Sequence, residues 1–175
     1  SHFELAIDDV TYRCPLPALR GHHQISNAAL AAAALHYTKL CDTEQAINGI
    51  SHAFWPGRVQ KLTTGHLLNF TSQTPIWLDG AHNAHGAAAL VNTLSDKKWC
   101  VIVGALDTRP IGDFLAQIAP MTERLIAITI PDQPAALSGK TIAKAASDLS
   151  LPSQSAASLQ AALTMAQDEA HILIC

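Results

Sequence analysis

The sequence predicts an α/β fold from about residue 57 onward, with a mostly parallel, Rossmann-like sheet that is covered by helices on both faces. Two observations lead to this prediction. Short apolar runs of strand length alternate with segments of helical periodicity, and runs such as WCVIVGAL and RLIAITI are apolar at nearly every position. A strand that is apolar on both sides is typical of a parallel sheet that lies between two layers of helices.

The first third of the chain has a different organisation. Residues 3–19 (FELAIDDVTYRCPLPAL) alternate between polar and apolar side chains as strands do, and prolines close the segment. After Gly21 the apolar residues follow a helical period, and a second helix is expected at 43–53. The segment FWPGRVQ then interrupts the pattern, because proline and glycine are unfavourable inside a helix. We therefore expect one domain at 1–56 and another at 57–175.

The second domain is expected to contain short strands followed by a regular alternation of helices and strands. Its strands are expected at 59–62, 67–70, 76–78, 99–106, 124–130 and 171–175. Its helices are expected at 84–94, 111–119, 138–149 and 156–170. Because the chain begins and ends inside expected strands, we also expect it to be a fragment of a longer protein.

Composition argues against several classes of function. The hydrophobic fraction is 49%, the charged fraction is 14% and the formal net charge is -3, which is typical of a globular chain. The sequence has no cluster of Lys and Arg to bind nucleic acid, and its longest alanine-rich run, at 28–35, is too short to span a bilayer. The four cysteines lie far apart without a CxxC pair, which favours reduced thiols in a cytoplasmic protein.

Three motif matches are incomplete. Gly139–Thr141 resembles the end of a phosphate-binding loop, but the chain has Pro134 where that loop needs glycine, so we expect Ser138 to cap an ordinary helix. A GxGxxG fingerprint follows none of the expected strands, which argues against a nicotinamide-dependent dehydrogenase. His82 and His85 lie three residues apart without a third ligand at suitable spacing, so no metal site is expected.

The segment DGAHN at 79–83 is the strongest candidate for a functional site. It follows the apolar run PIWL and precedes an alanine-rich helical segment, so a carboxylate, an imidazole and an amide share a turn between a strand and a helix. Ligands collect at the carboxyl ends of parallel strands, where helix N-termini offer free N–H groups to anions. The alternative is that Asp79 or Asn83 only caps the helix.

Three segments occur in a characteristic order: GHHQISNAALAAAAL at 21–35, PGRVQ at 56–60 and DGAHN at 79–83. Together they resemble the second half of the folylpolyglutamate synthase/dihydrofolate synthase family, within the Mur ligase superfamily. The resemblance covers nearly the whole chain. It implies that residues 1–56 are the tail of a central P-loop ATPase-type domain, and that residues 57–175 form most of the Rossmann-like carboxy-terminal domain.

The resemblance also implies an activity for the full-length parent. Such enzymes are cytoplasmic, usually monomeric ligases that use ATP and Mg²⁺ to join L-glutamate to dihydropteroate or a folate through an acyl phosphate. ATP binds between the two domains, and the Mg²⁺ ligands are expected mainly in the part that precedes this chain. We therefore expect the 175 residues to be inactive by themselves.

Four residues match positions with known roles in that family. Asn27 matches an asparagine that contacts adenine, and an amide suits this role because it both donates and accepts hydrogen bonds. Arg58 matches an arginine that reaches ATP from the domain junction. Asp79 matches an aspartate near the ribose and adenine, and His82 matches a catalytic histidine that faces the reaction centre. We expect Asn83 to be a helix cap.

The chain also departs from the family pattern. In the loop at 108–110, Arg109 keeps the cation that the family usually has as lysine, whereas Pro110 removes a carboxylate. Two alternatives therefore stay open. One is a cell-wall Mur ligase, which adds an amino acid to a UDP-linked precursor, and the other is a non-catalytic nucleotide-binding module.

Overall fold

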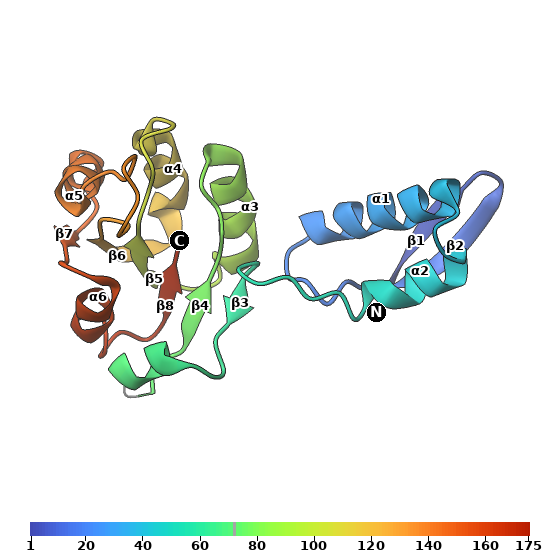
Figure 1. Cartoon of the computed structure of the whole chain (residues 1–175), viewed down its shortest axis with the longest axis horizontal. Coiled ribbons are helices and arrows are strands. Elements are labelled where there is room, and N and C mark those ends of the chain that lie inside the picture. The colour runs from blue at the N-terminus through green and yellow to red at the C-terminus, as the bar shows by residue number, and fades with distance from the viewer. Residues whose placement is uncertain (72) are drawn as a thin grey trace. The chain divides into compact units, whose positions relative to one another are not determined.

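The computed structural model describes residues 1–71 and 73–175 (Figure 1). The chain divides into two compact units, Ser1–Arg58 and Val59–Cys175. Each unit has its own hydrophobic core and is described by itself. None of the described helices combines the length and the apolar character that crossing a bilayer requires.

The first unit consists of a hairpin and two helices. Strands β1 (His2–Ile7) and β2 (Val10–Pro15) pair antiparallel, as their alternating pattern predicts. Helix α1 (His23–Thr38) and helix α2 (Thr43–Ile50) follow, and α2 begins with a capping box between Asp42 and Gln45. Helix α2 ends at Ile50, before the expected position 53. A small core holds the unit together, and it consists of Cys14, Ala32, Ala46, Ile47 and Ile50.

The second unit is built on a six-stranded sheet with the order β3-β4-β8-β5-β6-β7. Only the short edge strand β3 runs antiparallel to its neighbour, so the prediction of an α/β fold with a mostly parallel sheet is confirmed. The strands are β3 (Gln60–Lys61), β4 (Ile76–Leu78), β5 (Trp99–Val103), β6 (Thr122–Ala127), β7 (Ser153–Ser155) and β8 (Ile172–Ile174). The helices are α3 (Ala84–Leu94), α4 (Ile111–Ile118), α5 (Gly139–Asp148) and α6 (Leu159–Met165), with a short 3₁₀-helix at Ala119–Met121.

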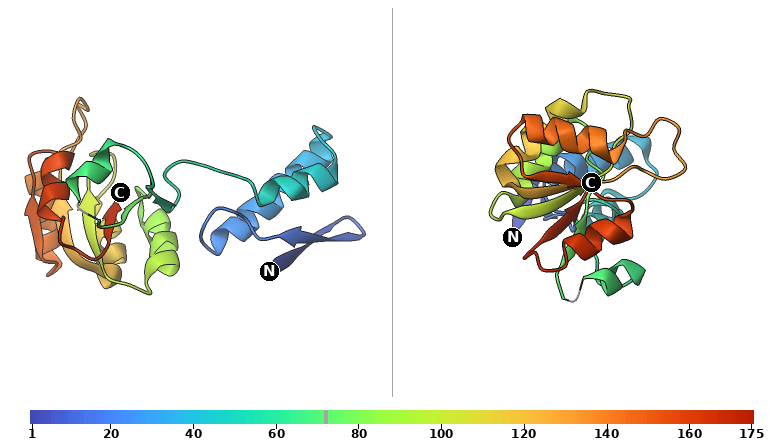
Figure 2. Two further views of the ribbon diagram at one scale, coloured as in Figure 1. Left: turned by 90° about the horizontal axis from the view of Figure 1, so that it is seen from below. Right: turned by 90° about the vertical axis from the view of Figure 1, so that its left-hand side faces the viewer.

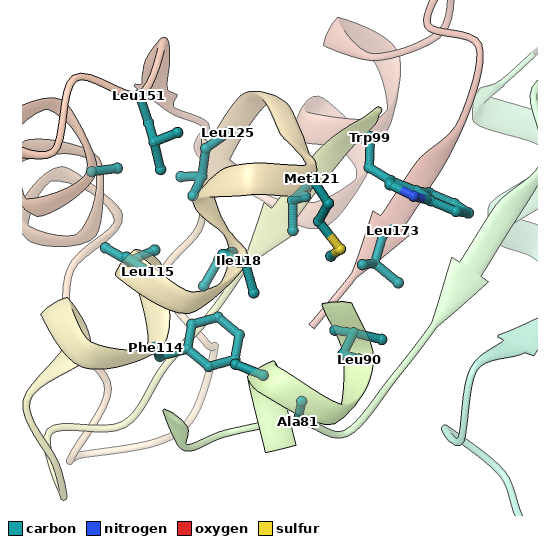
Figure 3. Close-up of a cluster of buried hydrophobic side chains, with 14 of the residues drawn as sticks. Ala81, Leu90, Trp99, Phe114, Leu115, Ile118, Met121, Leu125, Leu151 and Leu173 are labelled. Atoms are coloured by element: carbon teal, nitrogen blue, oxygen red, sulfur yellow. The ribbon is translucent and has the colours of Figure 1, made fainter. Parts of the chain in front are cut away.

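Helices cover both faces of this sheet. Successive residues of the central strands point to opposite sides. One set, which includes Val101 and Leu125, packs with α3, α4 and α5, and Figure 3 shows this core around Phe114 and Ile118. The other set, which includes Ile102, packs with α6. The right-hand view of Figure 2 shows α5 and α6 on opposite sides of the sheet.

The expected strand at 67–70 is wrong. Residues His66–Phe70 form a 3₁₀-helix, because Leu67, Leu68 and Phe70 all pack against the same hydrophobic cluster as α6. In a strand, consecutive side chains at 67 and 68 would point to opposite faces. The segment is apolar, as expected, but its side chains follow the period of a 3₁₀-helix and not that of a strand.

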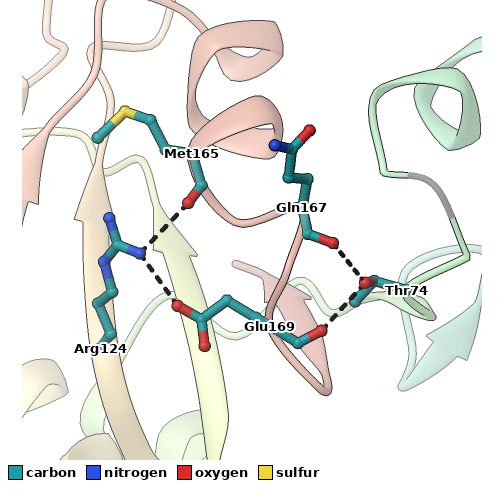
Figure 4. A network of polar contacts seen from close by, with 5 residues as sticks. All are labelled: Thr74, Arg124, Met165, Gln167 and Glu169. Carbon is teal, nitrogen blue, oxygen red and sulfur yellow. Dashed lines mark hydrogen bonds and ion pairs between the residues drawn. The ribbon is translucent and has the colours of Figure 1, made fainter.

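The expected helix at 156–170 is shorter than predicted. Strand β7 occupies Ser153–Ser155, and α6 begins only after Ser158, whose hydroxyl accepts a hydrogen bond from the Ala161 N–H at 3.1 Å. The connection from α6 to β8 is fixed by polar contacts, which Figure 4 shows. Arg124 of β6 donates to Glu169 at 3.0 Å, and Thr74 donates to the carbonyl of the same residue at 3.0 Å.

The segment Gly139–Thr141 begins α5, and its cap is the one expected. The Ser138 hydroxyl accepts a hydrogen bond from the Thr141 N–H at 3.0 Å. Gly139 is buried against β6, where a Cβ atom would lie 2.9 Å from the carbonyl oxygen of Ala127. Glycine is thus required here for close packing of helix on strand.

Candidate functional site

The DGAHN segment forms the turn between β4 and α3, as the sequence predicts. The Asp79 N–H donates to the Ile174 carbonyl at 2.9 Å, which continues the pairing of β4 with β8 by one residue. Asn83 is the N-cap of α3, and its side-chain oxygen accepts from the Gly86 N–H at 2.8 Å. Asn83 is therefore the capping residue, as expected.

Asp79 is buried, and both of its carboxylate oxygens accept hydrogen bonds from the backbone. One oxygen accepts from the Val59 N–H and the other from the Ala81 N–H, each at 2.8 Å. The side chain is 8% exposed. Asp79 therefore ties the beginning of the second unit to the DGAHN turn.

A cavity of about 580 Å³ lies at the carboxyl ends of the strands. The DGAHN turn forms one wall, and the loop that follows β5 together with the first turn of α4 forms another. Ile130 comes from the segment after β6, and Cys175 directly follows β8. The lining comprises residues 81–85, 103–106, 108–111, 113 and 114, with Ile130 and Cys175. This is the edge at which the sequence predicts a ligand.

The wall of the cavity carries charged and polar side chains among apolar ones. His82, His85 and Arg109 line it together with Asp113. The His82 ring is exposed, and its Nδ1 lies 2.9 Å from the Gly80 carbonyl oxygen, which leaves Nε2 for other contacts. Within 1–71 and 73–175, neither Arg109 nor Asp113 forms a side-chain hydrogen bond or an ion pair.

Two helix N-termini border the same cavity. Helix α3 begins after Asn83 and α4 begins after Pro110, and residues of both first turns contribute to the lining. Each N-terminus carries a partial positive charge of about +0.5 and unpaired backbone N–H groups. Together with Arg109, these termini make the cavity suited to a carboxylate or a phosphate.

The loop after β5 is held against a second loop. The Asp107 N–H donates to the Ala135 carbonyl at 2.7 Å, and the Leu137 N–H donates to the Ala105 carbonyl at 2.9 Å. At Gly104 a Cβ atom would lie 2.9 Å from Cγ1 of Ile130, so the two loops approach closely. These contacts fix the backbone that leads to Arg109.

The predicted site residues lie in different parts of the structure. His82 is in the cavity wall, whereas Asp79 is buried at the start of the turn and does not line the cavity. Asn27 is exposed on α1 and donates to the Gln24 side chain at 3.0 Å, and Arg58 is exposed at the end of the first unit. The roles of these residues remain predictions.

Asp113 was not predicted from the sequence to be a site residue, and His85 was discussed there only as a possible metal ligand. Asp113 lies in the first turn of α4, three residues after Pro110, and His85 lies in the first turn of α3. The signal that could have found them is their position just after two loops that both follow parallel strands.

The described part of the chain contains no group of three His, Cys, Asp or Glu side chains placed to hold a metal ion.

Two cysteine thiols of the second unit have raised pKa values. Burial raises the pKa of Cys100 to about 12, and burial together with the Asp79 carboxylate raises the pKa of Cys175. These two thiols are therefore poor nucleophiles.

Among curated proteins, the chain is similar to a dihydrofolate synthase/folylpolyglutamate synthase of Mycobacterium tuberculosis, with 28% identity over 134 residues. That match covers 74% of this chain and 27% of the relative, so the chain spans about a quarter of the relative's length.

Solved structures share the fold. A folylpolyglutamate synthase of M. tuberculosis complexed with ADP superimposes with a TM-score of 0.77 at 24% identity, over 94% of this chain and 39% of that one. A bifunctional folylpolyglutamate synthase/dihydrofolate synthase with Mn, AMPPNP and L-glutamate bound has a TM-score of 0.76 at 24% identity, over 97% and 39%. The model of the family described as "Mur ligase, glutamate ligase domain" matches residues 57–175, and the chain therefore belongs to this family.

Proposed function

We propose that the chain is the carboxy-terminal part of an ATP-dependent ligase that adds L-glutamate to dihydropteroate, to folylpolyglutamate or to both, through an acyl phosphate. Membership of the glutamate ligase domain family supports this proposal. So does the similarity in sequence to a dihydrofolate synthase/folylpolyglutamate synthase. In this proposal residues 1–56 are the end of the central ATPase-type domain and residues 57–175 are the glutamate ligase domain.

The observation that carries the proposal is the cavity at the strand ends. L-glutamate has two carboxylates, and for these the cavity offers Arg109, the imidazole of His85 and two helix N-termini. A guanidinium binds a carboxylate with two parallel hydrogen bonds, which fixes its orientation as well as its position. We assign the incoming glutamate to this cavity, with its carboxylates near Arg109 and the two helix N-termini.

His82 has the geometry to act on the reacting groups. Its Nδ1 lies within hydrogen-bond distance of the Gly80 carbonyl, which fixes the ring and favours the tautomer with the proton on Nδ1. Nε2 is then an acceptor. An acceptor on the wall of the amino-acid cavity is suited to orient the amine of glutamate toward the acyl carbon.

In this proposal, other residues bind the nucleotide. Asn27 is assigned to adenine, Arg58 to the phosphates or ribose, and Asp79 to the ribose. ATP supplies the phosphoryl group that activates the acceptor carboxylate. The backbone bonds of Asp79 leave further lone pairs on its oxygens, which can accept a hydrogen bond from a hydroxyl.

Within the described residues, no three His, Cys, Asp or Glu side chains are placed together to hold a metal ion. We therefore assign no step through Mg²⁺ to this part of the protein. We further propose that the parent is a cytoplasmic monomer.

The proposal is tested by measuring ATP hydrolysis by the full-length parent in the presence of L-glutamate and either dihydropteroate or tetrahydrofolate. Folate-dependent turnover is expected, with Arg58→Ala weakening ATP affinity and His82→Ala lowering kcat. The matched control is Lys140→Ala, which removes an exposed cation of the incomplete GKT motif and should leave turnover unchanged.

The other candidate functions are outcomes of the same assay. Turnover only with a UDP-linked precursor would identify a cell-wall ligase instead. Absence of turnover with either acceptor, in a parent that is folded and binds ATP, would contradict the proposal and favour a non-catalytic nucleotide-binding module.

A further inference from the structure

The cavity at the strand ends contains two opposite charges that do not form an ion pair with each other. Arg109 and Asp113 both line it, yet within the two described stretches of the chain neither side chain forms an ion pair. Charged side chains that face a common cavity without pairing are suited to a ligand that itself carries both signs of charge. We infer that Asp113 binds the ammonium group of the incoming amino acid.

This inference rests on the proposed function, because it takes an amino acid as the occupant of the cavity. Among the described lining residues, Asp113 carries the only carboxylate side chain. Arg109 offers a cation to the carboxylates, and the N–H of the neutral His85 imidazole can donate to them. An ammonium group has three donors and no acceptor, so a carboxylate is its natural partner.

The charge balance agrees with an amino acid that has an acidic side chain. The side-chain charges of Arg109 and Asp113 cancel, and the two helix N-termini contribute about +0.5 each, so with neutral imidazoles the side chains and helix termini together contribute about +1. Glutamate at neutral pH carries two carboxylates and one ammonium. Its net charge is opposite to that of the cavity.

The position of Asp113 is well fixed. Its neighbours Phe114 and Leu115 are 4% and 0% exposed, and both belong to the core between α4 and the sheet. Asp113 itself is exposed, so binding an ammonium here costs little desolvation. It also lies in the first turn of α4, where a carboxylate is favoured without any ligand.

The test compares two ligands that differ only in the amine. L-glutamate and glutarate are titrated into the whole 175-residue chain, as wild type, Asp113→Asn and Asp107→Asn, with calorimetry or NMR shifts as the readout. Asp107 is the matched control, because it is an exposed acid on the loop that precedes α4 and does not line the cavity. Melting curves verify that each variant is folded.

For Asp113→Asn we expect glutamate affinity to fall about tenfold, which is the lower end for a lost charge-assisted hydrogen bond because the site is open to solvent. Glutarate affinity should stay the same or rise, and Asp107→Asn should bind both ligands like wild type. Equal losses for both ligands, unchanged glutamate binding, or wild-type chain that does not bind glutamate would each overturn the inference.

These outcomes are separate from those of the proposed function. A parent without folate-dependent turnover, but with glutamate binding that depends on Asp113, would refute only the ligase proposal. A parent with turnover, whose Asp113→Asn variant has an unchanged KM for glutamate, would refute only the role of Asp113.

Discussion

Replacing Asp79 with asparagine tests what this buried carboxylate does. In the structure its two oxygens accept from the N–H groups of Val59 and Ala81, residues that are 5% and 8% exposed. An asparagine side chain has one oxygen and one NH₂ group. It can satisfy only one of these donors, and the NH₂ group then faces the other N–H.

The expected loss of stability follows from that count. A buried N–H that loses a charged acceptor costs about 1.5–3 kcal/mol. For a chain of this size about 2–4 °C of melting temperature corresponds to each kcal/mol, so the Asp79→Asn chain should melt about 3–12 °C below wild type.

The assay is thermal unfolding of the 175-residue chain, followed by circular dichroism. Asp96→Asn, which removes an exposed acid, is the control and should melt with wild type. An Asp79→Asn chain that melts with wild type would refute the structural role. If the Asp79→Asn chain melted with wild type but the same substitution weakened nucleotide binding by the parent, the predicted contact with the ribose would be the main function of Asp79.

Three further perturbations have defined outcomes. Gly139→Ala places a Cβ atom against the backbone of β6 and should cost about 1–3 kcal/mol in denaturant unfolding, whereas Gly112→Ala, which meets nothing within 4 Å, should be neutral or slightly stabilising. Asn83→Ala removes the cap of α3 and should lower the free energy of unfolding by about 1 kcal/mol. A thiol reagent at pH 8 should leave Cys100 unmodified until the chain unfolds, because its pKa of about 12 leaves almost no thiolate, and rapid modification in the folded chain would contradict this.

The parts of the fold that the sequence predicted well are those where burial dictates the pattern. Strand β5 is apolar throughout, and so is the second half of β6 (Leu125–Ala127), because both faces are covered there, and this pattern is visible without any structure. Strand β7 (SQS) was missed, since it is a partly exposed edge strand with only polar residues. Its pairing with β6 comes from the backbone, which leaves no signal in the side chains.

Only one wall of the candidate site could be predicted from the sequence. DGAHN is recognisable because its residue types and its position between a strand and a helix are both local features. The opposite wall, with Arg109 and Asp113, depends on which strands are neighbours. Strand β8 separates β4 from β5, and this order cannot be read from the sequence of elements along the chain.

The place of β8 has a consequence for folding. It follows all the other strands of the sheet in the sequence, yet it lies between β4 and β5. During synthesis, β4 and β5 therefore have no partner strand between them until the ILI segment leaves the ribosome. Such non-local pairing is slow, and the edges of β4 and β5 stay exposed until β8 pairs with them. The two walls of the cavity are thus brought together by a strand that is synthesised after both of them.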